Sequence, residues 1–167
     1  MTGLAFCDMP EPTDARVWVA GRDDAAEVTR LMIAFRDWWE RTEPSDESFA
    51  AGVARLLDDP QTEFLLAAPS GRAAAGVCQL RFRHGLWYDA PDCWLEDVYV
   101  EGAARRSGLG RALGEAALER ARERGCRRIQ LDVNEANPEA IALYESLGFD
   151  SVQDPPGGRL LLMTRWI

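Results

Sequence analysis

Several residue types on which common catalytic mechanisms depend are absent or rare in this sequence of 167 residues. There is no lysine, which excludes a Walker-type phosphate loop because that motif requires a Gly-Lys pair. The single histidine is His84, so any Ser-His-Asp or Cys-His mechanism would have to use it. The four cysteines, Cys7, Cys78, Cys93 and Cys126, are too scattered for the usual zinc motifs. The sequence therefore predicts no metal site.

Long apolar runs are also absent, and no stretch approaches the roughly 20 residues that a membrane-spanning helix needs. The acidic N-terminal segment contains Pro10 and Pro12 and is unlike a secretory signal peptide. Hydrophobic residues make up 47% of the chain, which is enough for a core, and the length is typical of one domain. We expect a single cytoplasmic domain over residues 1–167, with an irregular arm at 1–15, reduced and buried thiols, and no membrane partner.

Charge is unevenly distributed along the chain. Residues 1–100 contain 18 acidic and 9 basic side chains, whereas residues 101–128 contain eight Arg and four Glu. The net charge of −9 disfavours sequence-independent binding to nucleic acid, so we expect no such partner. The acidic part suits a cationic substrate and the basic part suits a polyanionic cofactor. Solvated charge that keeps the protein soluble explains the acidic part equally well.

Hydrophobic periodicity and turn residues predict an α/β fold in the order β-α-α-β-β-β-α-β-α-β-β. The expected helices begin after Asp23 or Asp24, after Ser45, near Gly108 and after Asn137. Residues 83–92 are expected to form a loop. The expected strands are residues 16–20, 64–68, 74–82, 93–100, 128–133, 149–153 and 160–165.

The segment of residues 105–111 lies between an expected strand and an expected helix. A helix N-terminus exposes backbone N–H groups and carries a partial positive charge. Gly108 and Gly110 would let a phosphate approach these groups without a Cβ in the way, and three arginines add positive charge. The segment therefore predicts a diphosphate site, with a plain turn carrying solvated arginines as the alternative. Its residues are Arg105, Arg106, Ser107, Gly108, Leu109, Gly110 and Arg111.

The pattern Arg105-x-x-Gly108-x-Gly110 resembles the acetyl-CoA signature (Arg/Gln)-x-x-Gly-x-(Gly/Ala) of the GNAT superfamily of N-acetyltransferases. A second block from Leu131 to Phe149, which includes Asn137-Pro138, also matches in the same order. The resemblance covers residues 60–167 well and the first helices loosely. It implies a GNAT-like, mixed, mostly antiparallel central sheet flanked by helices, and a homodimer, which is a common state among relatives.

The resemblance further implies that acetyl-CoA is the cosubstrate. Backbone groups of Val98 and Val100 would pair with the pantetheine arm as with an added strand. Amides of residues 106–111 would bind the pyrophosphate, and Asn137 would reach the cofactor arm, although a helix cap explains Asn137 equally well. The implied cofactor-binding residues are Val98, Tyr99, Val100, Arg105, Arg106, Ser107, Gly108, Leu109, Gly110, Arg111, Asn137 and Tyr144.

Three residues are candidates for catalysis. The resemblance implies that Tyr144 is the general acid, since a neutral phenol can donate a proton to the CoA thiolate at pH 7; packing on a helix face is the alternative. Glu96 or Asp97 would accept the proton of a primary amine, or would bind a cationic substrate or an Arg. Adjacent strand residues point to opposite faces, so only one of the two acids faces the acceptor unless a bulge intervenes.

The segment Trp94–Val100, together with the loop that carries Trp87 and Tyr88, is also similar to the diamine/spermidine acetyltransferase branch. In that branch the paired acids lie at the acceptor site. We therefore expect acetyl transfer by direct attack of the primary amine of a small cationic acceptor, with an aminoglycoside as a further option. A protein N-terminal or lysine acetyltransferase and a non-catalytic acyl-CoA-binding module are the alternatives. Trp38 and Trp39 either line the acceptor pocket or pack in the core.

Overall fold

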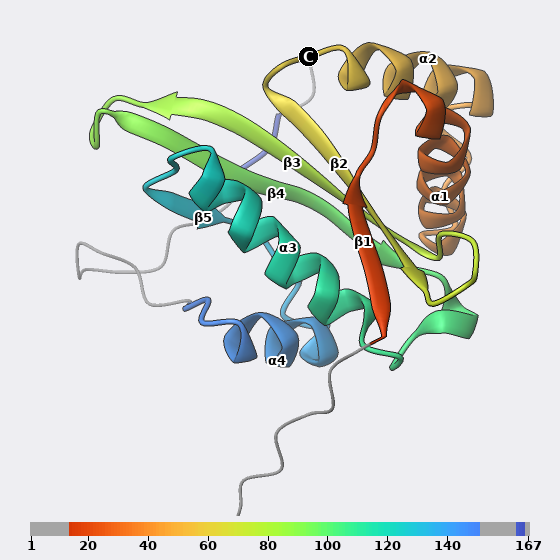
Figure 1. The fold of residues 1–167 in the computed structure, drawn as a ribbon. Coiled ribbons are helices and arrows are strands. Elements are labelled where there is room, and N and C mark those ends of the chain that lie inside the picture. Colours follow the sequence, from red (N-terminus) through yellow and green to blue (C-terminus); the bar gives the residue numbers. More distant parts are fainter. Residues whose placement is uncertain (1–13, 151–162, 166–167) are drawn as a thin grey trace, which may run out of the picture. The chain divides into compact units, whose positions relative to one another are not determined.

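The computed structural model describes residues 14–150 and 163–165 of the chain. The described residues fall into two compact units, one within Met1–Asp132 and one within Val133–Ile167. The first unit contains the whole sheet and three of the α-helices, and the second contains α4 (Pro138–Ser146) (Figure 1).

The first unit is built on a five-stranded sheet in the order β1-β2-β3-β4-β5. Neighbouring strands from β1 to β4 are antiparallel, and β5 is parallel to β4. The sheet is therefore mixed and mostly antiparallel, and the expected fold class is confirmed. The strands are β1 (Ala15–Val19), β2 (Thr62–Pro69), β3 (Gly76–Gly85), β4 (Ala90–Val100) and β5 (Arg128–Gln130).

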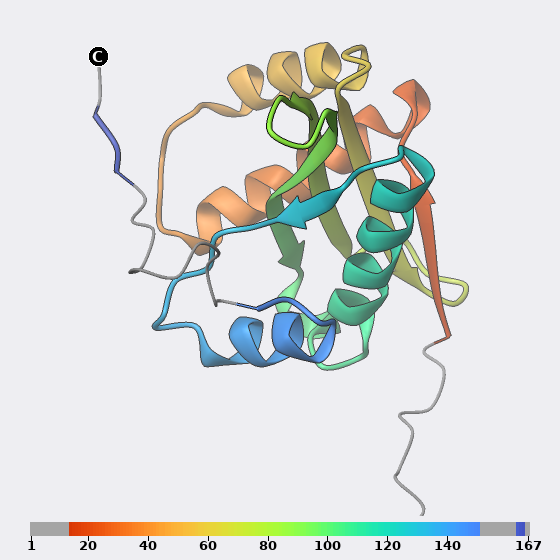
Figure 2. The same cartoon turned by 90° about the vertical axis from the view of Figure 1, so that its left-hand side faces the viewer.

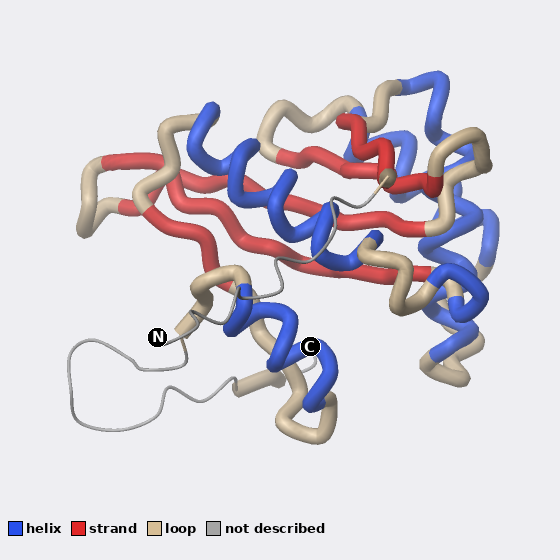
Figure 3. Tube along the Cα trace, turned by 60° about the horizontal axis from the view of Figure 1, so that its bottom comes forward, coloured by secondary structure: helices blue, strands red, loops and turns tan. Residues whose placement is uncertain are grey.

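Helices cover both faces of this sheet, and Figure 2 shows α3 and α1 on opposite sides of the strands. The helix α3 (Leu109–Glu123) runs across the strands on one face, as Figure 3 also shows, and buries an apolar stripe that includes Leu113 and Ala117. The other face packs against α1 (Ala25–Trp38) and α2 (Asp46–Leu57). Two short 3-10 helices, Arg22–Asp24 and Gly102–Ala104, complete the unit.

The helix boundaries follow the capping signals in the sequence. Asp24 occupies the N-cap position of α1, and the hydroxyl of Ser45, the N-cap of α2, accepts a hydrogen bond from the backbone N–H of Ser48. Gly125 follows α3 with a φ of 71°, a left-handed conformation that glycine adopts at little cost. The expected helix boundaries are confirmed, but Asp24 caps α1 by position only, because its carboxylate accepts a hydrogen bond from the N–H of Gly21 and none from the N–H groups of α1.

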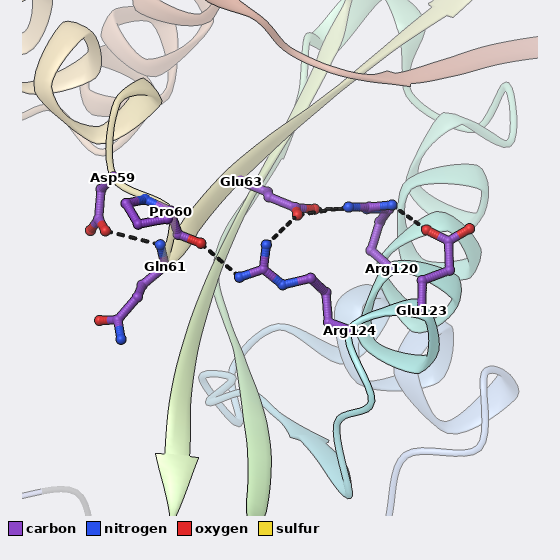
Figure 4. Close-up of polar contacts among 7 residues, drawn as sticks. All are labelled: Asp59, Pro60, Gln61, Glu63, Arg120, Glu123 and Arg124. Atoms are coloured by element: carbon purple, nitrogen blue, oxygen red, sulfur yellow. Dashed lines mark hydrogen bonds and ion pairs between the residues drawn. The ribbon is translucent and has the colours of Figure 1, made fainter.

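An ion-pair cluster ties α3 to the sheet through a glutamate of β2 (Figure 4). The carboxylate of Glu63, 9% exposed, accepts two 2.7 Å hydrogen bonds from Arg120. Arg124 donates a third hydrogen bond to Glu63 at 3.2 Å and another to the carbonyl of Pro60 at 2.6 Å. Arg120 also pairs with Glu123. The second half of α3 is thus held against β2 by charge-assisted hydrogen bonds as well as by apolar packing.

A bulge interrupts β4. Gln79 of β3 is opposite Asp97, but the next residue, Leu80, is opposite Leu95, so Glu96 is an extra residue in β4. The side chains of Cys93 and Leu95 pack with the α3-facing core before the bulge, as those of Val98 and Val100 do after it. The extra residue therefore shifts the alternation of β4 by one position.

Two expectations about strand ends are wrong. Residues 83–92 are not a loop, because the β3–β4 ladder continues through the pairs Arg83–Asp92 and Gly85–Ala90, and only residues 86–89 form the turn. The carboxylate of Asp92 accepts hydrogen bonds from Arg128 of β5, which ties this extended part of β4 to the sheet. The strand β5 ends at Gln130 rather than at residue 133, because its pairing with β4 covers only Asp92–Trp94, on the near side of the bulge.

The second unit is described by itself. Its helix α4 has Asn137 at the N-cap, whose side-chain oxygen accepts a hydrogen bond from the N–H of Ala140 at 3.1 Å, and Pro138 at the first position. Gly148 follows the helix with a φ of 86°. The two strands expected near residues 149–153 and 160–165 lie mainly outside the described residues.

Candidate active site

The loop between β4 and α3 has the backbone shape of an anion site. Gly108 is the N-cap of α3 and has a φ of 85°, and Arg106 has a φ of 60°. The hydroxyl of Ser107 donates a hydrogen bond to the carbonyl of Ala104 at 2.7 Å, which fixes the turn. The first turn of α3, beginning at Leu109, presents N–H groups that have no partner within the helix. A diphosphate could be bound there by backbone groups and by the partial positive charge of the helix end.

The three arginines of this loop are placed differently. Arg106 is exposed. Arg111 lies 3.8 Å from Glu115, one turn further along α3. The Nε of Arg105 donates a hydrogen bond to the carbonyl of Val100 at 3.1 Å, and its guanidinium lies 5.0 Å from the ring centroid of Trp38. The structure thus brings Arg105 to the end of β4 and to α1.

The second half of β4 has one edge bonded to β3 and one edge that no strand in the described residues covers. The N–H of Glu101 bonds to the carbonyl of Ala75 on the β3 side. Because backbone groups alternate along a strand, the N–H and C=O of Val98 and Val100 point to the uncovered edge. The hydrogen bond from Arg105 to the Val100 carbonyl agrees with this direction. The sequence predicted these two residues for strand-like pairing, and the backbone directions fit that prediction.

The acids at the bulge have different environments. Glu96 is exposed, whereas Asp97 is half-buried. Asp97 lies two residues before Tyr99, whose side chain is in the core under α1 and α2, so by alternation Asp97 points to the same face. Burial, together with the neighbouring negative charges of Glu96 and Asp132, raises the pKa of Asp97 from 3.8 to about 6. A carboxyl with a pKa near 6 is mostly ionised at pH 7 and can still exchange protons.

Aromatic rings connect this part of β4 with the end of α1. The ring of Tyr99, 8% exposed, stacks on Phe35 with centroids 5.3 Å apart. Phe35 stacks on Trp38 at 6.2 Å, and Trp39 meets Trp38 edge-on at 4.9 Å. Trp38 and Trp39 are 47% and 48% exposed, so neither is a core residue, although core packing was one of the two expected roles. Tyr99 itself was predicted to bind the cofactor; its side chain is placed in the core and its backbone pairs with β3.

Two predicted site residues belong to the second unit. Asn137 caps α4, as one of its two expected roles requires. The ring of Tyr144 on α4 meets Phe149 edge-on, with centroids 5.7 Å apart, and its side chain is half-buried. The roles of Tyr144 as a general acid and of Asn137 as a cofactor contact stay predictions.

The described cysteines are free thiols. Cys78 and Cys93 are buried in the core, and Cys126 is half-buried. Burial raises the pKa of Cys93 to about 12 and that of Cys78 still further, so both stay protonated at neutral pH. The expectation of buried thiols agrees with the structure for Cys78 and Cys93, whereas Cys126 is only half-buried and Cys7 lies outside the described residues. Among residues 14–150 and 163–165, no group of three or more potential metal ligands gathers, and no helix is both long and apolar enough to cross a bilayer.

Comparison with known proteins shows the family. Residues 28–149 match the family model described as the acetyltransferase (GNAT) family. The chain belongs to the GNAT family. The uncovered edge of β4 and the glycine turn at the start of α3 both lie within the matched residues.

Similar proteins are named as acetyltransferases. The chain is 34% identical over 151 residues to a mycothiol acetyltransferase of Thermobispora bispora, a match that covers 89% of this chain and 50% of that protein. A thialysine N-epsilon-acetyltransferase of Bos taurus is 29% identical over 105 residues, or 63% of this chain and 58% of that protein. The chain spans about half the length of the curated relatives it matches.

Solved structures share the fold. A crystal structure of a protein from Arthrobacter sp. FB24 has a TM-score of 0.80 and 27% identity, and covers 96% of this chain and 100% of that one. An aminoglycoside N-acetyltransferase crystallised in complex with CoA has a TM-score of 0.74 at 18% identity, with 94% of this chain and 98% of that chain covered. At that identity the likeness concerns the fold alone.

Sequence reasoning missed three features of the site: the position of the bulge, the contacts of Arg105, and the approach of Asp132 to Asp97. The bulge left a signal in the sequence, because the apolar residues that face α3 alternate regularly except for one extra residue between Leu95 and Val98. The other two features depend on contacts between segments that are separate in the sequence, and no local pattern encodes them.

Proposed function

We propose that this chain transfers the acetyl group of acetyl-CoA to the primary amine of a small cationic acceptor, by direct attack of the amine. The observation that carries the proposal is the uncovered edge of β4 at Val98 and Val100, which leads directly into the glycine turn at the start of α3. An extended arm on this edge would place its diphosphate end at the turn. Membership of the GNAT family supports the same reaction.

The residues present fit acetyl-CoA. Val98 offers an N–H and a C=O, and Val100 an N–H, to an extended chain with amide groups, as one strand does to another. The backbone of residues 106–111 would bind the diphosphate, and Arg106 would add charge. Acetyl-CoA supplies an acetyl group that is activated as a thioester.

Asp97 is the better candidate for the base. It is the acid that shares the face of Tyr99 and has the raised pKa, whereas Glu96 is exposed. A primary amine with a pKa near 10.4 is about 0.1% neutral at pH 7, so the reaction needs a proton acceptor. We propose that Asp97 accepts the amine proton, directly or through water, and that Glu96 attracts the cationic acceptor. Tyr144 would donate a proton to the departing thiolate.

The small-molecule acceptor is supported by the names of related proteins and by charge. Relatives and fold neighbours include mycothiol and aminoglycoside acetyltransferases. Asp97, Glu96 and Asp132 make the region around the bulge acidic, which suits an acceptor with more than one positive charge.

A panel assay tests this function. The protein is mixed with acetyl-CoA and, in turn, with a polyamine, a diamine, an aminoglycoside, an aminosugar conjugate, and a peptide that has a free N-terminus or a lysine, while the free thiol is measured. Thiol release with the small amines supports the proposal. Release with peptides alone would point to a protein acetyltransferase, and acetyl-CoA binding without thiol release on any amine would point to a binding module.

A further inference from the structure

The side chain of Arg105 is already engaged at the end of β4. Its Nε donates to the Val100 carbonyl at 3.1 Å, and its guanidinium lies over the ring of Trp38 at 5.0 Å. The Val100 carbonyl is the last group of the uncovered edge before the chain turns into residues 101–108. The geometry points to a positioning role for Arg105, and this inference rests on the proposed function.

We propose that Arg105 closes the end of the β4 edge and so fixes where strand-like pairing with the pantetheine arm stops. With the Val100 carbonyl occupied, the edge groups that remain are the N–H and C=O of Val98 and the N–H of Val100. A bound arm pairs with these and then leaves the edge toward the turn at Gly108. Arg105 thereby sets the register of the cofactor, and the diphosphate is held by other groups.

The sequence motif supports this positioning role rather than a role in neutralising the charge of the phosphates. The signature that this segment resembles accepts Arg or Gln at this position. The two side chains differ in charge and in length, but each has an N–H donor on the nitrogen that follows Cδ, and a donor is what the Val100 carbonyl requires. A residue whose main task was to neutralise phosphate would not be replaced by a neutral one.

The guanidinium group that bonds to Val100 also contacts Trp38 of α1. Trp38 is connected through Phe35 to Tyr99 of β4, so both contacts of Arg105 lead back to the same strand. A guanidinium over a partly exposed Trp ring is a weak attraction, so this contact steadies the side chain without fixing it alone.

Three variants test the role: Arg105→Gln, Arg105→Met and, as a matched control for charge, Arg106→Gln. The measurements are the Kd for CoA by titration calorimetry at several salt concentrations, and the KM values for acetyl-CoA and for the amine. Arg105 is exposed, so all three chains are expected to fold; thermal melting checks this. Arg105→Gln keeps the donor, Arg105→Met removes it at similar length, and Arg106→Gln removes one charge from the loop.

We expect Arg105→Met to weaken CoA binding by about 3- to 10-fold, the usual effect of one lost hydrogen bond, and to raise the KM for acetyl-CoA and not that for the amine. Arg105→Gln should bind CoA nearly as tightly as the parent, and its Kd should depend on salt as the parent's does. Arg106→Gln should flatten the salt dependence, since a lost charge reduces what salt can screen.

Equal losses in Arg105→Gln and Arg105→Met, with flattened salt dependence in both, would overturn the inference and make Arg105 a phosphate ligand. Parent-like binding by Arg105→Met would overturn it as well. Failure of the parent itself to bind CoA would refute the proposed function and this inference together, whereas parent binding with either of the first two results refutes the inference alone.

Discussion

A single residue, Glu96, decides which groups of β4 face which side. Because it is an extra residue in the strand, the alternation changes after it, and Val98 and Val100 point their side chains at α3 and their backbone groups at the uncovered edge. The same shift turns Asp97 toward the face of Tyr99. The chemistry proposed for this strand depends on that one insertion.

The raised pKa of Asp97 predicts an unusual dependence of stability on pH. Because the folded pKa, about 6, is above the ordinary value of 3.8, the folded state favours the protonated carboxyl. The stability from this preference is complete below the unfolded pKa and is lost as pH rises through the folded pKa. Asp97→Asn should therefore be more stable than the parent at pH 8 by about 1 to 3 kcal/mol, since one pKa unit corresponds to about 1.4 kcal/mol.

Urea unfolding at pH 4, 6 and 8 measures this effect, with Asp23→Asn, the same substitution at an exposed position away from the bulge, as the control. The difference between Asp97→Asn and the parent should shrink toward pH 4. A difference that is constant with pH would show that the carboxyl is not destabilised in the folded protein.

The proposed general acid gives a second prediction at this scale. Tyr144→Phe removes only the hydroxyl, so the edge-on contact with Phe149 can persist. We expect turnover to fall by about 10²- to 10⁴-fold with an unchanged Kd for CoA. Single-turnover assays and calorimetry measure the two quantities, and a variant as active as the parent would remove Tyr144 from the mechanism.

Among the elements, α3 has two roles: its N-terminus forms the proposed diphosphate site, and its apolar face covers one side of the sheet. Its second half is fixed by Glu63, whose carboxylate bonds to Arg120 and Arg124 (Figure 4). The position of the glycine turn relative to the edge of β4 therefore depends on how firmly α3 is packed on the sheet.

Glu63→Gln should lower the free energy of unfolding by about 1 to 3 kcal/mol, because two arginines would lose a largely buried charged partner. The control is Glu119→Gln, which breaks an exposed pair with Arg122 and should cost less than about 0.5 kcal/mol. Thermal and urea unfolding of both variants give the comparison. Equal effects would mean that the cluster adds nothing beyond surface charge.

For the whole molecule, ligand binding should appear as added stability. Acetyl-CoA at about 100 times its Kd adds about 2.7 kcal/mol, which corresponds to a rise in Tm of roughly 5 to 10 °C for a chain of this size. Gly108→Val should abolish the rise, because the side chain would crowd a bound diphosphate and because a β-branched residue is strained at a φ of 85°.

The strain lowers the Tm of Gly108→Val itself, so the quantity to compare is the shift with and without acetyl-CoA. Gly102→Ala is the matched control, since a Cβ there meets nothing within 4 Å. It should keep the parent's shift. A normal shift in Gly108→Val would refute the placement of the diphosphate.

The sequence by itself determined much of this protein: the order of elements as far as α4, the caps at Ser45 and Asn137, and the glycine turn before α3. These follow from local backbone chemistry, which a short stretch of residues encodes. Only the tertiary structure decided where β4 bulges, which acid is shielded from water, and where the side chain of Arg105 lies. Pairing register, burial and contacts between distant segments depend on the packing of the whole sheet, which no local pattern specifies.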